Sequence, residues 1–393
     1  MNKAILNTAN QEFINSNLNS DITALLLKKN INSPVDIKLL VEQIEAKKRC
    51  KKKLPTWFNT KQIYYPNKLN IEQTSSEQTA DYKSKLIKGN SILDLTGGFG
   101  VDSSQFANHF SNVTHCEINK ELSEIVKHNF KQLKINNVDC LAADGIEYLK
   151  KIKKKYDWIY IDPSRRHISK GKVFFLSDCS PNLLNHLDLL FMHSNNIMVK
   201  TSPLLDLSVG INELSGVKTI HIVAVNGEVK EILWILSKDY KKSILVVTAN
   251  IKAEKAEYFK FNLKQEEEAE VSYSEPLSYL YEPNAAILKS GAFKLVSQQL
   301  KVNKLHINTH LYTHKKLIDF PGRSFKIEKV LPYSKKLLKK EFVYRANISS
   351  RNFPESIDQI RRKLKIKDGG KYFLFITTSV IINKVIIICT KVD

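Results

Sequence analysis

The chain has 393 residues, which is enough for about two to four compact units that each bury a core. Its composition, 42% hydrophobic and 26% charged, excludes a wholly disordered chain. Five scattered cysteines without a C-x-x-C pair exclude a disulfide framework and a cysteine-bound zinc site, so we expect reduced thiols and no metal.

Residues 1–88 are predicted to form a helical region and a connector. Apolar residues recur at helical spacing in 22–27 and 35–44. A basic run at 47–53 follows, which is either a solvated helix face or a phosphate contact. The first residues lack the basic and apolar regions of a signal peptide, so we expect a cytoplasmic protein.

From residue 89 to residue 248, short buried strands alternate with amphipathic helices. The predicted strands are 91–96, 113–118, 138–144, 157–162, 196–201, 219–225 and 231–237. Helix-length segments separate the first five, which makes them parallel, whereas the short link 226–230 makes the last two an antiparallel hairpin. The predicted fold class is α/β, with a Rossmann-like sheet of seven strands.

Two smaller units are predicted after this sheet. Residues 249–320 form a linking α+β segment of possible ferredoxin-like type, in which the acidic run 266–270 is expected to be a loop or linker. Residues 321–393 form a small α+β module that ends in a hairpin, with its turn at Asn383-Lys384. This turn interrupts the apolar stretch 372–392, so we expect no membrane span.

The net charge of +21 is distributed unevenly along the chain. Residues 91–240 hold 17 basic and 17 acidic side chains, whereas residues 321–393 hold 17 and 6, a net +11. A basic flank beside a neutral centre indicates that one part holds a polyanion that another part modifies, and RNA is the expected partner. A Lys-, Asn- and Ile-rich composition from an AT-rich genome would give the same excess without nucleic acid.

Acidic residues end four of the predicted strands in order. Asp94 begins the turn 94–102 (DLTGGFGVD), in which Thr96, Gly98 and Gly100 bring the backbone close to a ligand at the start of a helix. The other three are Glu117, Asp144 and Asp162. A glycine turn alone is also a common packing turn, but four acids at one sheet edge indicate a nucleotide-like cofactor, with Glu117 on the ribose and Asp144 near the adenine.

Four segments carry a resemblance to a known family: 94–102 (DLTGGFGVD), 162–166 (DPSRR), 281–289 (YEPNAAILK) and 351–354 (RNFP). Together they resemble the class I S-adenosylmethionine-dependent methyltransferases, and among these the bacterial ones that end in a THUMP-like domain. The resemblance implies the fold, S-adenosyl-L-methionine as cofactor and an RNA-binding accessory module.

The segment 73–80 (QTSSEQTA) is similar to the one that precedes the cofactor turn in cap-guanine methyltransferases. There a hydroxyl and a carboxylate help to close the methionine pocket, which implies cofactor contacts from Ser76 and Glu77. Independently, Ser76 or Thr74 could cap the helix that starts near Glu77. The two interpretations are compatible.

The expected catalytic residues are Asp162, Pro163, Ser164 and Arg165. Enzymes that methylate exocyclic base amines usually carry Asp/Asn-Pro-Pro-aromatic here, whereas this chain has Ser-Arg-Arg, so stacking must come from elsewhere or the arginines grip a phosphate or carboxylate. Arg165 and Arg166 could instead pair with acids of the core. No cysteine stands where carbon methylation needs its nucleophile, and Cys179 is expected on a core helix.

These observations favour an RNA methyltransferase that transfers its methyl group directly to a base nitrogen. A similar glycine turn in a ribosomal guanine-amine methyltransferase, with the segment 73–80, tilts the prediction towards guanine. The alternatives are a catalytically inactive methyltransferase-like RNA-binding or assembly protein, and a protein or small-molecule methyltransferase. A dehydrogenase shares the glycine turn, but the antiparallel hairpin counts against it.

Overall fold

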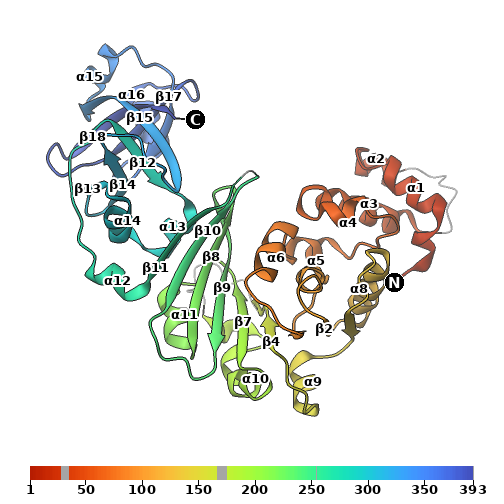
Figure 1. The fold of residues 1–393 in the computed structure, drawn as a ribbon. Coiled ribbons are helices and arrows are strands. Elements are labelled where there is room, and N and C mark those ends of the chain that lie inside the picture. The colour runs from red at the N-terminus through yellow and green to blue at the C-terminus, as the bar shows by residue number, and fades with distance from the viewer. Residues whose placement is uncertain (28–34, 166–174, 254, 393) are drawn as a thin grey trace. The chain divides into compact units, whose positions relative to one another are not determined.

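The computed structural model describes residues 1–27, 35–165, 175–253 and 255–392 (Figure 1). Two compact units divide the chain: residues 1–218 with 233–241, and residues 219–232 with 242–393. Among the helices of these ranges, none combines the length and the apolar character needed to cross a bilayer.

The N-terminal region is helical, as predicted, and packs on the first half of the sheet domain. Its elements are η1 (Lys3–Leu6), α1 (Thr8–Ser16), α2 (Ile22–Leu26), α3 (Ile37–Lys53), α4 (Pro55–Asn59), α5 (Lys68–Gln73) and α6 (Glu77–Ser84). Most begin at an Asn, Asp or Ser whose side chain accepts a backbone N–H, as expected for helix caps. Their apolar faces share one core with α7 (Val101–Phe106) and α8 (Lys120–Gln132) (Figure 1).

The basic run 47–53 lies on the last turns of α3, and parts of it are bound inside the protein. Lys47 is only 8% exposed, and its Nζ donates to Asn15 Oδ1 at 2.7 Å. Lys53 Nζ donates to the carbonyl oxygens of Ile71 and Glu72, both at 2.8 Å. The expectation of a solvated face is therefore wrong for Lys47, whose long side chain covers apolar surface while it reaches an acceptor. The other basic residues of the run are exposed or half-buried, and a phosphate contact stays a prediction.

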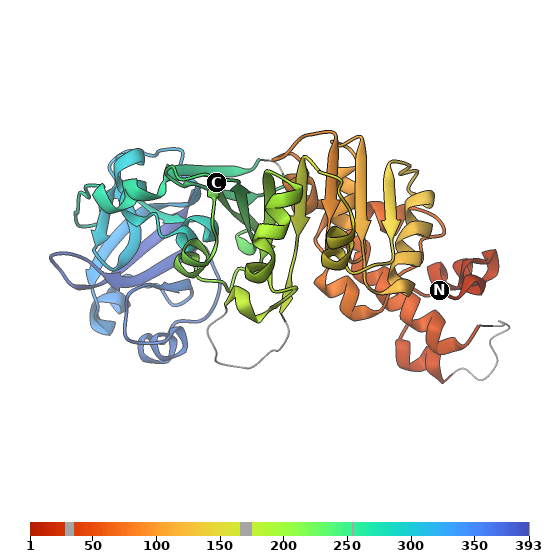
Figure 2. The same cartoon turned by 90° about the horizontal axis from the view of Figure 1, so that it is seen from below.

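The first sheet confirms the predicted α/β class and is larger than expected. It has nine strands in the order β11-β10-β8-β9-β7-β4-β1-β2-β3. Their bounds are β1 (Ser91–Asp94), β2 (Asn112–Cys116), β3 (Val138–Leu141), β4 (Trp158–Ile161), β7 (Asn196–Thr201), β8 (Val217–Val225), β9 (Glu228–Ser237), β10 (Leu245–Ile251) and β11 (Glu257–Asn262). β1 pairs in parallel with β2 and β4, β2 with β3, and β4 with β7 (Figure 2). Long crossovers, including α7, α8, α9 (Gly145–Lys151) and α10 (Leu187–His193), make this parallel order possible.

The sheet differs from the prediction in its hairpin and in its length. β8 and β9 are joined by Asn226-Gly227 alone, both with positive φ (50° and 82°), because β9 begins earlier than expected. β10 pairs in parallel with β8 over seven residues, 245–251, and β11 pairs antiparallel with β10. The sheet thus continues past the boundary expected at residue 248, since β8 offers β10 a full edge of backbone hydrogen bonds.

A second sheet of seven strands holds the C-terminal part, in the order β13-β14-β12-β15-β18-β17-β16. The strands are β12 (Tyr279–Pro283), β13 (Asn303–His306), β14 (Thr309–His314), β15 (Gly322–Pro332), β16 (Asn347–Ser350), β17 (Tyr372–Thr378) and β18 (Lys384–Lys391). Because β12 pairs with β15 over five residues, the sheet runs across the boundary expected at 320/321. The helices are α12 (Leu263–Glu268), α13 (Ala285–Ser290), α14 (Phe293–Leu300), α15 (Lys335–Lys340) and α16 (Ile357–Leu364).

The acidic run 266–270, expected to be a loop or linker, begins inside helix α12. Glu266 accepts the backbone N–H groups of Lys294 (2.7 Å) and Leu295 (2.9 Å) at the start of α14. A carboxylate is favoured at a helix start because the first N–H groups have no partner within the helix. Residues 266–268 are helical because α12 starts earlier, at a capping box between Asn262 and Gln265, and Glu266 in turn caps a second helix.

The terminal hairpin turns over residues 379–383 rather than at Asn383-Lys384 alone. Glu275 explains the wider turn, because its Oε1 accepts the N–H of Ile381 at 2.6 Å and its Oε2 accepts Ser379 Oγ at 2.8 Å. Ile381 is left 80% exposed. Apolar residues near the turn extend the strand pattern in the sequence but not the strand itself.

Two segments that carried the family resemblance meet at Glu282, which is 4% exposed. Arg323 Nε donates to Glu282 Oε2 at 2.7 Å, and Arg351 Nη2 lies 2.7 Å from Glu282 Oε1. A buried carboxylate needs such partners because it has lost its hydration. The bonds tie the end of β12 to the start of β15 and to the residue that follows β16.

We expect Gly227→Ala to destabilise the β8–β9 hairpin by about 1 to 2 kcal/mol, the cost of a left-handed conformation for a residue with a Cβ. A Cβ at Gly227 meets no atom within 4 Å, so the cost is conformational and not a clash. Asn226→Gly is the matched control and should leave stability within about 0.5 kcal/mol. Urea unfolding monitored by tryptophan fluorescence measures both, and equal midpoints for the two variants would contradict the turn assignment.

Candidate active site at the carboxyl edge of the first sheet

Asp94 is the last residue of β1 and is 1% exposed. Its Oδ2 accepts Ser103 Oγ at 2.6 Å, and its Oδ1 accepts the N–H of Thr96 at 3.1 Å. Burial, together with the charges of Asp102 and Asp162, raises the pKa of Asp94 to about 7, against the lowering effect of the two hydrogen bonds. Asp94 is therefore a carboxyl group close to its titration point at neutral pH.

The glycine turn fits closely over the strand below it. A Cβ at Gly97 would lie 2.2 Å from the ring of His115, a buried residue of β2. Gly98 and Gly100 have φ values of +53° and +79°, which residues with a Cβ rarely adopt. A Cβ at Gly100 would also lie 2.7 Å from the Phe130 ring. Sterics therefore require glycine at Gly97 and Gly100, whereas at Gly98 only the left-handed backbone favours it.

Glu117 directly follows β2 and is tied to the glycine turn. Its Oε2 accepts the N–H of Gly98 at 2.9 Å, and its Oε1 accepts the N–H of Asn119 at 2.8 Å. Both oxygens are held in fixed positions beside the turn, and the side chain is partly exposed. A carboxylate in this place can accept further hydrogen bonds from hydroxyl groups, because each oxygen has two lone pairs.

Asp144 lies three residues beyond the end of β3, which stops at Leu141, so the expected strand 138–144 is too long. The residue is exposed and caps α9, with its Oδ1 accepting the N–H groups of Ile146 (2.8 Å) and Glu147 (3.1 Å). The strand ends earlier because Asp144 starts a helix. One oxygen of the carboxylate acts as the cap, and the side chain remains open to solvent.

Asp162 directly follows β4, and its carboxylate is paired. Its N–H donates to Thr96 Oγ1 at 2.7 Å, and its Oδ2 forms an ion pair with Lys200 of β7. The described residues give Oδ1 no hydrogen-bond donor. One oxygen at the end of β4 is thus available to a further donor while a lysine holds the other.

The rest of the expected catalytic segment forms a short strand. Pro163 is buried, and β5 (Ser164–Arg165) pairs with β6 (Cys179–Ser180). Ser164 is exposed, and its Oγ donates weakly to the carbonyl of Ser180 at 3.4 Å. The Arg165 side chain and Arg166 lie outside the described residues. Cys179 is buried as expected, but in β6 rather than on a helix.

A buried ion pair lies beneath the turn and was not predicted. Lys83 of α6 is 0% exposed, and its Nζ lies 3.0 Å from Asp102 Oδ1 and 2.9 Å from Ser75 Oγ. Asp102 Oδ2 accepts hydrogen bonds from Ser75 Oγ and from the Tyr160 hydroxyl, both at 2.8 Å. Burial alone would raise the pKa of Asp102, yet Lys83 and Lys200 hold it below its usual value.

Ser76 and Glu77, expected at the cofactor, both serve helix starts. Ser76 Oγ accepts the N–H of Thr79 at 3.2 Å and so caps α6. Glu77 binds the N–H of Thr56 (2.7 Å) and its hydroxyl (2.9 Å) at the start of α4, and burial raises the pKa of Glu77. Their contact with a cofactor stays a prediction.

Direct hydrogen bonds connect five of the expected site residues in two sets. Thr96 links Asp94 to Asp162, and Gly98 links the turn to Glu117. Asp144, Ser76 and Glu77 make no direct hydrogen bond to this group. Lys83, Asp102 and Lys200 were missed, although Asp102 ends the quoted motif. No group of three or more metal-binding side chains occurs in the ranges the structure describes.

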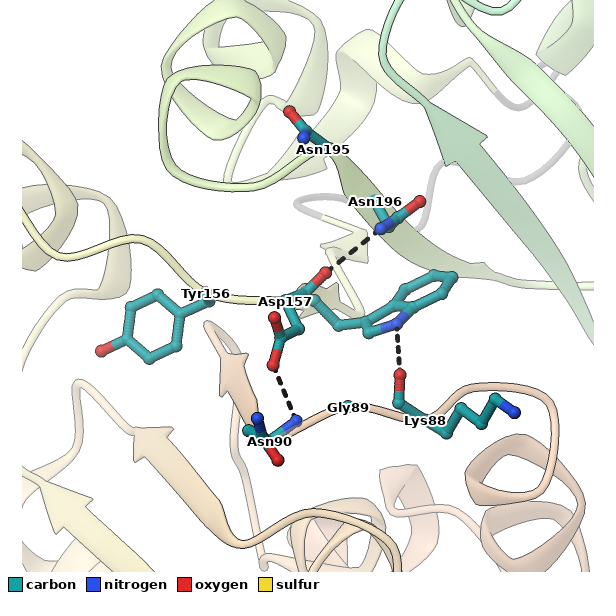
Figure 3. Close-up of a pocket in the computed structure, with 8 residues that line it drawn as sticks. Lys88, Gly89, Asn90, Tyr156, Asp157, Asn195 and Asn196 are labelled. Atoms are coloured by element: carbon teal, nitrogen blue, oxygen red, sulfur yellow. Dashed lines mark hydrogen bonds between the residues drawn. The ribbon is translucent and has the colours of Figure 1, made fainter.

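A cavity of about 350 Å³ lies at the opposite edge of the sheet (Figure 3). It is lined by residues before β1 and around the starts of β4 and β7: Lys88, Gly89, Asn90, Tyr156, Asp157, Trp158, Asn195 and Asn196. Asp157 Oδ2 accepts the N–H of Asn90 at 2.7 Å, and Trp158 Nε1 donates to the Lys88 carbonyl at 3.1 Å. In these hydrogen bonds both the donor and the acceptor belong to residues that line the cavity. Parallel sheets, moreover, bind ligands at the other edge. We assign the cavity no chemistry.

We expect Asp94→Asn to change the pH dependence of stability. Since the pKa of Asp94 is raised from 3.8 to about 7 on folding, its contribution to stability is complete below about pH 4 and is lost as pH rises to about 7. The free energy of unfolding of the variant minus that of wild type should therefore increase over this window, by at most about 1.4 kcal/mol per pH unit.

Urea unfolding at pH 4 to 8 measures this difference, in which other titrating groups cancel. One such group is His115, whose pKa burial lowers to about 4. Parallel curves for the two proteins would contradict a raised pKa for Asp94.

Three families match parts of the chain. Residues 84–236 match the spermine/spermidine synthase domain, residues 279–321 a ferredoxin-like domain, and residues 322–391 the THUMP domain-like family. The match over 84–236 contains the glycine turn and all four acidic residues of the sheet edge.

A solved structure is similar over the whole chain. The crystal structure of a "putative methyltransferase" from Porphyromonas gingivalis W83 is 34% identical, with a TM-score of 0.90, and the match covers 100% of this chain and 99% of that one. The ribosomal RNA small subunit methyltransferase D of Buchnera aphidicola (strain APS) is 32% identical over 108 residues, 26% of this chain. An uncharacterized RNA methyltransferase of Mycoplasma mobile is 31% identical over 96 residues, 24% of this chain. The matches span 56% and 26% of these two relatives.

Proposed function

The chain belongs to the class I methyltransferases with a C-terminal THUMP-like domain, and we propose that it uses S-adenosylmethionine to methylate a base nitrogen of RNA. The observation that carries the proposal is the pair of hydrogen-bonded sets at one sheet edge, one of Asp94, Thr96 and Asp162 and the other of Gly98 and Glu117. We further propose that residues 89–248 act as the catalytic domain and that the basic residues 321–393 hold the RNA.

Charge supports a cationic cofactor at this edge. Asp94, Asp102 and Asp162 face Lys83 and Lys200, so the group carries one negative charge in excess when all five are ionised. The sulfonium of S-adenosylmethionine is a cation and would be favoured there, and its charge would help to ionise Asp94. Glu117 is the proposed acceptor for the ribose hydroxyls, and the glycine turn leaves room for the cofactor backbone.

Transfer to nitrogen is supported by what surrounds Asp162. Its Oδ1 can accept an N–H of a base amine while Lys200 fixes the other oxygen, which orients the amine towards a methyl group. The cysteines argue against carbon methylation, because burial raises the pKa of the Cys116 thiol to about 12 and Cys179 is 1% exposed. Among base amines we favour that of guanine, on the similarity of the segments 73–80 and 94–102.

We expect the full chain to bind S-adenosylhomocysteine in titration calorimetry, and Glu117→Ala to weaken this binding roughly 10- to 100-fold. The estimate corresponds to about 1.5 to 3 kcal/mol for a lost charged hydrogen bond. Asp139→Ala, which removes an exposed acid of the neighbouring strand β3, is the matched control and should bind like wild type. A folded wild-type protein that does not bind the ligand would remove the enzyme proposal.

We expect Asp162→Ala to reduce methyl incorporation into RNA from a deletion strain by roughly 100-fold or more, because the site loses its acceptor for the amine. RNA binding should not change. Asp188→Ala, which removes an exposed acid of α10, is the control. Mass spectrometry of nucleosides from strains with and without the gene identifies the modified base.

The same assay tests a second candidate, an inactive methyltransferase-like protein that binds RNA. The Lys200 ion pair favours this candidate, since it occupies an oxygen that a substrate amine could use. An inactive protein would bind RNA and incorporate no methyl group even as wild type.

A further inference from the structure

Two large aromatic side chains are exposed in the loop between α15 and β16. Phe342 is 76% exposed and Tyr344 is 59% exposed, whereas Val343 between them is 5% exposed and belongs to the core under α15 and α16. Val343 anchors the loop, and its two neighbours present their rings to solvent. Exposed aromatic pairs are costly in water and are typical of binding surfaces.

Phe342 also has a strained backbone. Its φ is +55°, a left-handed conformation that is unfavourable for a bulky side chain. Its N–H donates to the Lys339 carbonyl at 3.3 Å, so the residue ends the last turn of α15, a position where glycine or asparagine is usual. Neither folding nor solubility favours phenylalanine here, whereas a binding role accounts for it.

The pair is surrounded by lysines whose charges are not balanced. Lys336, Lys339 and Lys340 lie exposed on α15. Lys367 lies beside the loop, because its N–H donates to the Tyr344 carbonyl at 2.9 Å, and Lys365 precedes it by two residues. None of these five lysines has a carboxylate within 4.0 Å among the described residues, while the nearby acids Glu341 and Asp368 pair with Lys329 and Arg361.

Charge and exposed rings together fit one class of partner. Single-stranded RNA presents both unstacked bases, which stack on aromatic rings, and phosphates, which bind lysines. A duplex hides the faces of its bases and could use only the lysines. A protein partner of the aromatic pair would instead be expected to bring carboxylates to the lysines.

We propose that Phe342 and Tyr344 form a stacking platform for unpaired bases of the RNA substrate, with the flanking lysines on its phosphates. The proposal rests on the proposed function for the identity of the partner and deepens it by naming unpaired nucleotides as what the C-terminal module holds. The bases that stack on this platform need not include the base that is methylated.

The test is fluorescence anisotropy of the full chain with a labelled 12-nucleotide single-stranded RNA and with the same RNA as a blunt duplex. Wild type should bind the single strand more tightly. Phe342→Ala with Tyr344→Ala should weaken single-strand binding at least about ten-fold and leave duplex binding within two-fold. Ile381→Ala, an exposed apolar residue of the same sheet's hairpin turn, is the matched control and should bind both RNAs like wild type.

Two further variants separate a binding role from a structural one. Phe342→Gly should weaken single-strand binding while its Tm is equal to or above that of wild type, because glycine relieves the left-handed strain. Lys339→Ala with Lys367→Ala should reduce the salt dependence of binding by about 0.7 in log–log slope per lost phosphate contact, and the aromatic variants should leave that slope unchanged.

The platform is overturned if the double aromatic variant binds the single strand within two-fold of wild type. It is also overturned if wild type binds the duplex equally well or binds neither RNA. Its failure is distinct from that of the proposed function, since cofactor binding and methyl incorporation are measured separately. If the double aromatic variant binds and methylates RNA like wild type, the platform is excluded and the proposed function still stands.

Discussion

A lysine without exposed surface is the constraint on which the candidate site depends. Lys83 must be paired because its ammonium has lost all hydration, and its partner Asp102 lies on the helix that leaves the glycine turn. Tyr160 of β4 binds the same carboxylate. The N-terminal helices, the turn and the strand that leads to Asp162 are therefore held by one buried group. The helical region thus belongs to the same compact unit as the glycine turn.

The charges of the two lysines, Lys83 and Lys200, affect the pKa values of the neighbouring acids. Lys83 and Lys200 lower the pKa of Asp102, and Lys200 also forms an ion pair with Asp162. Asp94 has no such ion pair among the described residues, and its two printed partners are the Ser103 hydroxyl and the Thr96 N–H. Its pKa near 7 follows from this arrangement and from its burial. The site thus combines fixed charges with one group whose protonation can respond to a cationic ligand.

Much of the sheet and its acidic edge could be predicted from the sequence, because each buried strand has its own apolar pattern and ends at a polar residue. Asp94, Glu117 and Asp162 follow this rule, whereas Ala142 and Ala143 extend the pattern of β3 past its true end. Lys83 could not be found, because its partner is 19 residues away and only the fold brings them together. Glu266 could not be assigned from the sequence for the same reason. Its run of acids resembles a linker in the sequence, and only the fold brings it to the start of α14.

The nine-stranded order also bears on how such proteins can be divided or recombined. β10 follows β8 over seven residue pairs, although it lies beyond the part of the chain that matches the synthase-type domain. A chain ended after β9 would leave the inner strand β8 as an open edge, ready to pair with other chains. Exchange of C-terminal modules between relatives is therefore expected to keep β8, β10 and β11 together, because the three strands pair with one another and lie mostly within one compact unit.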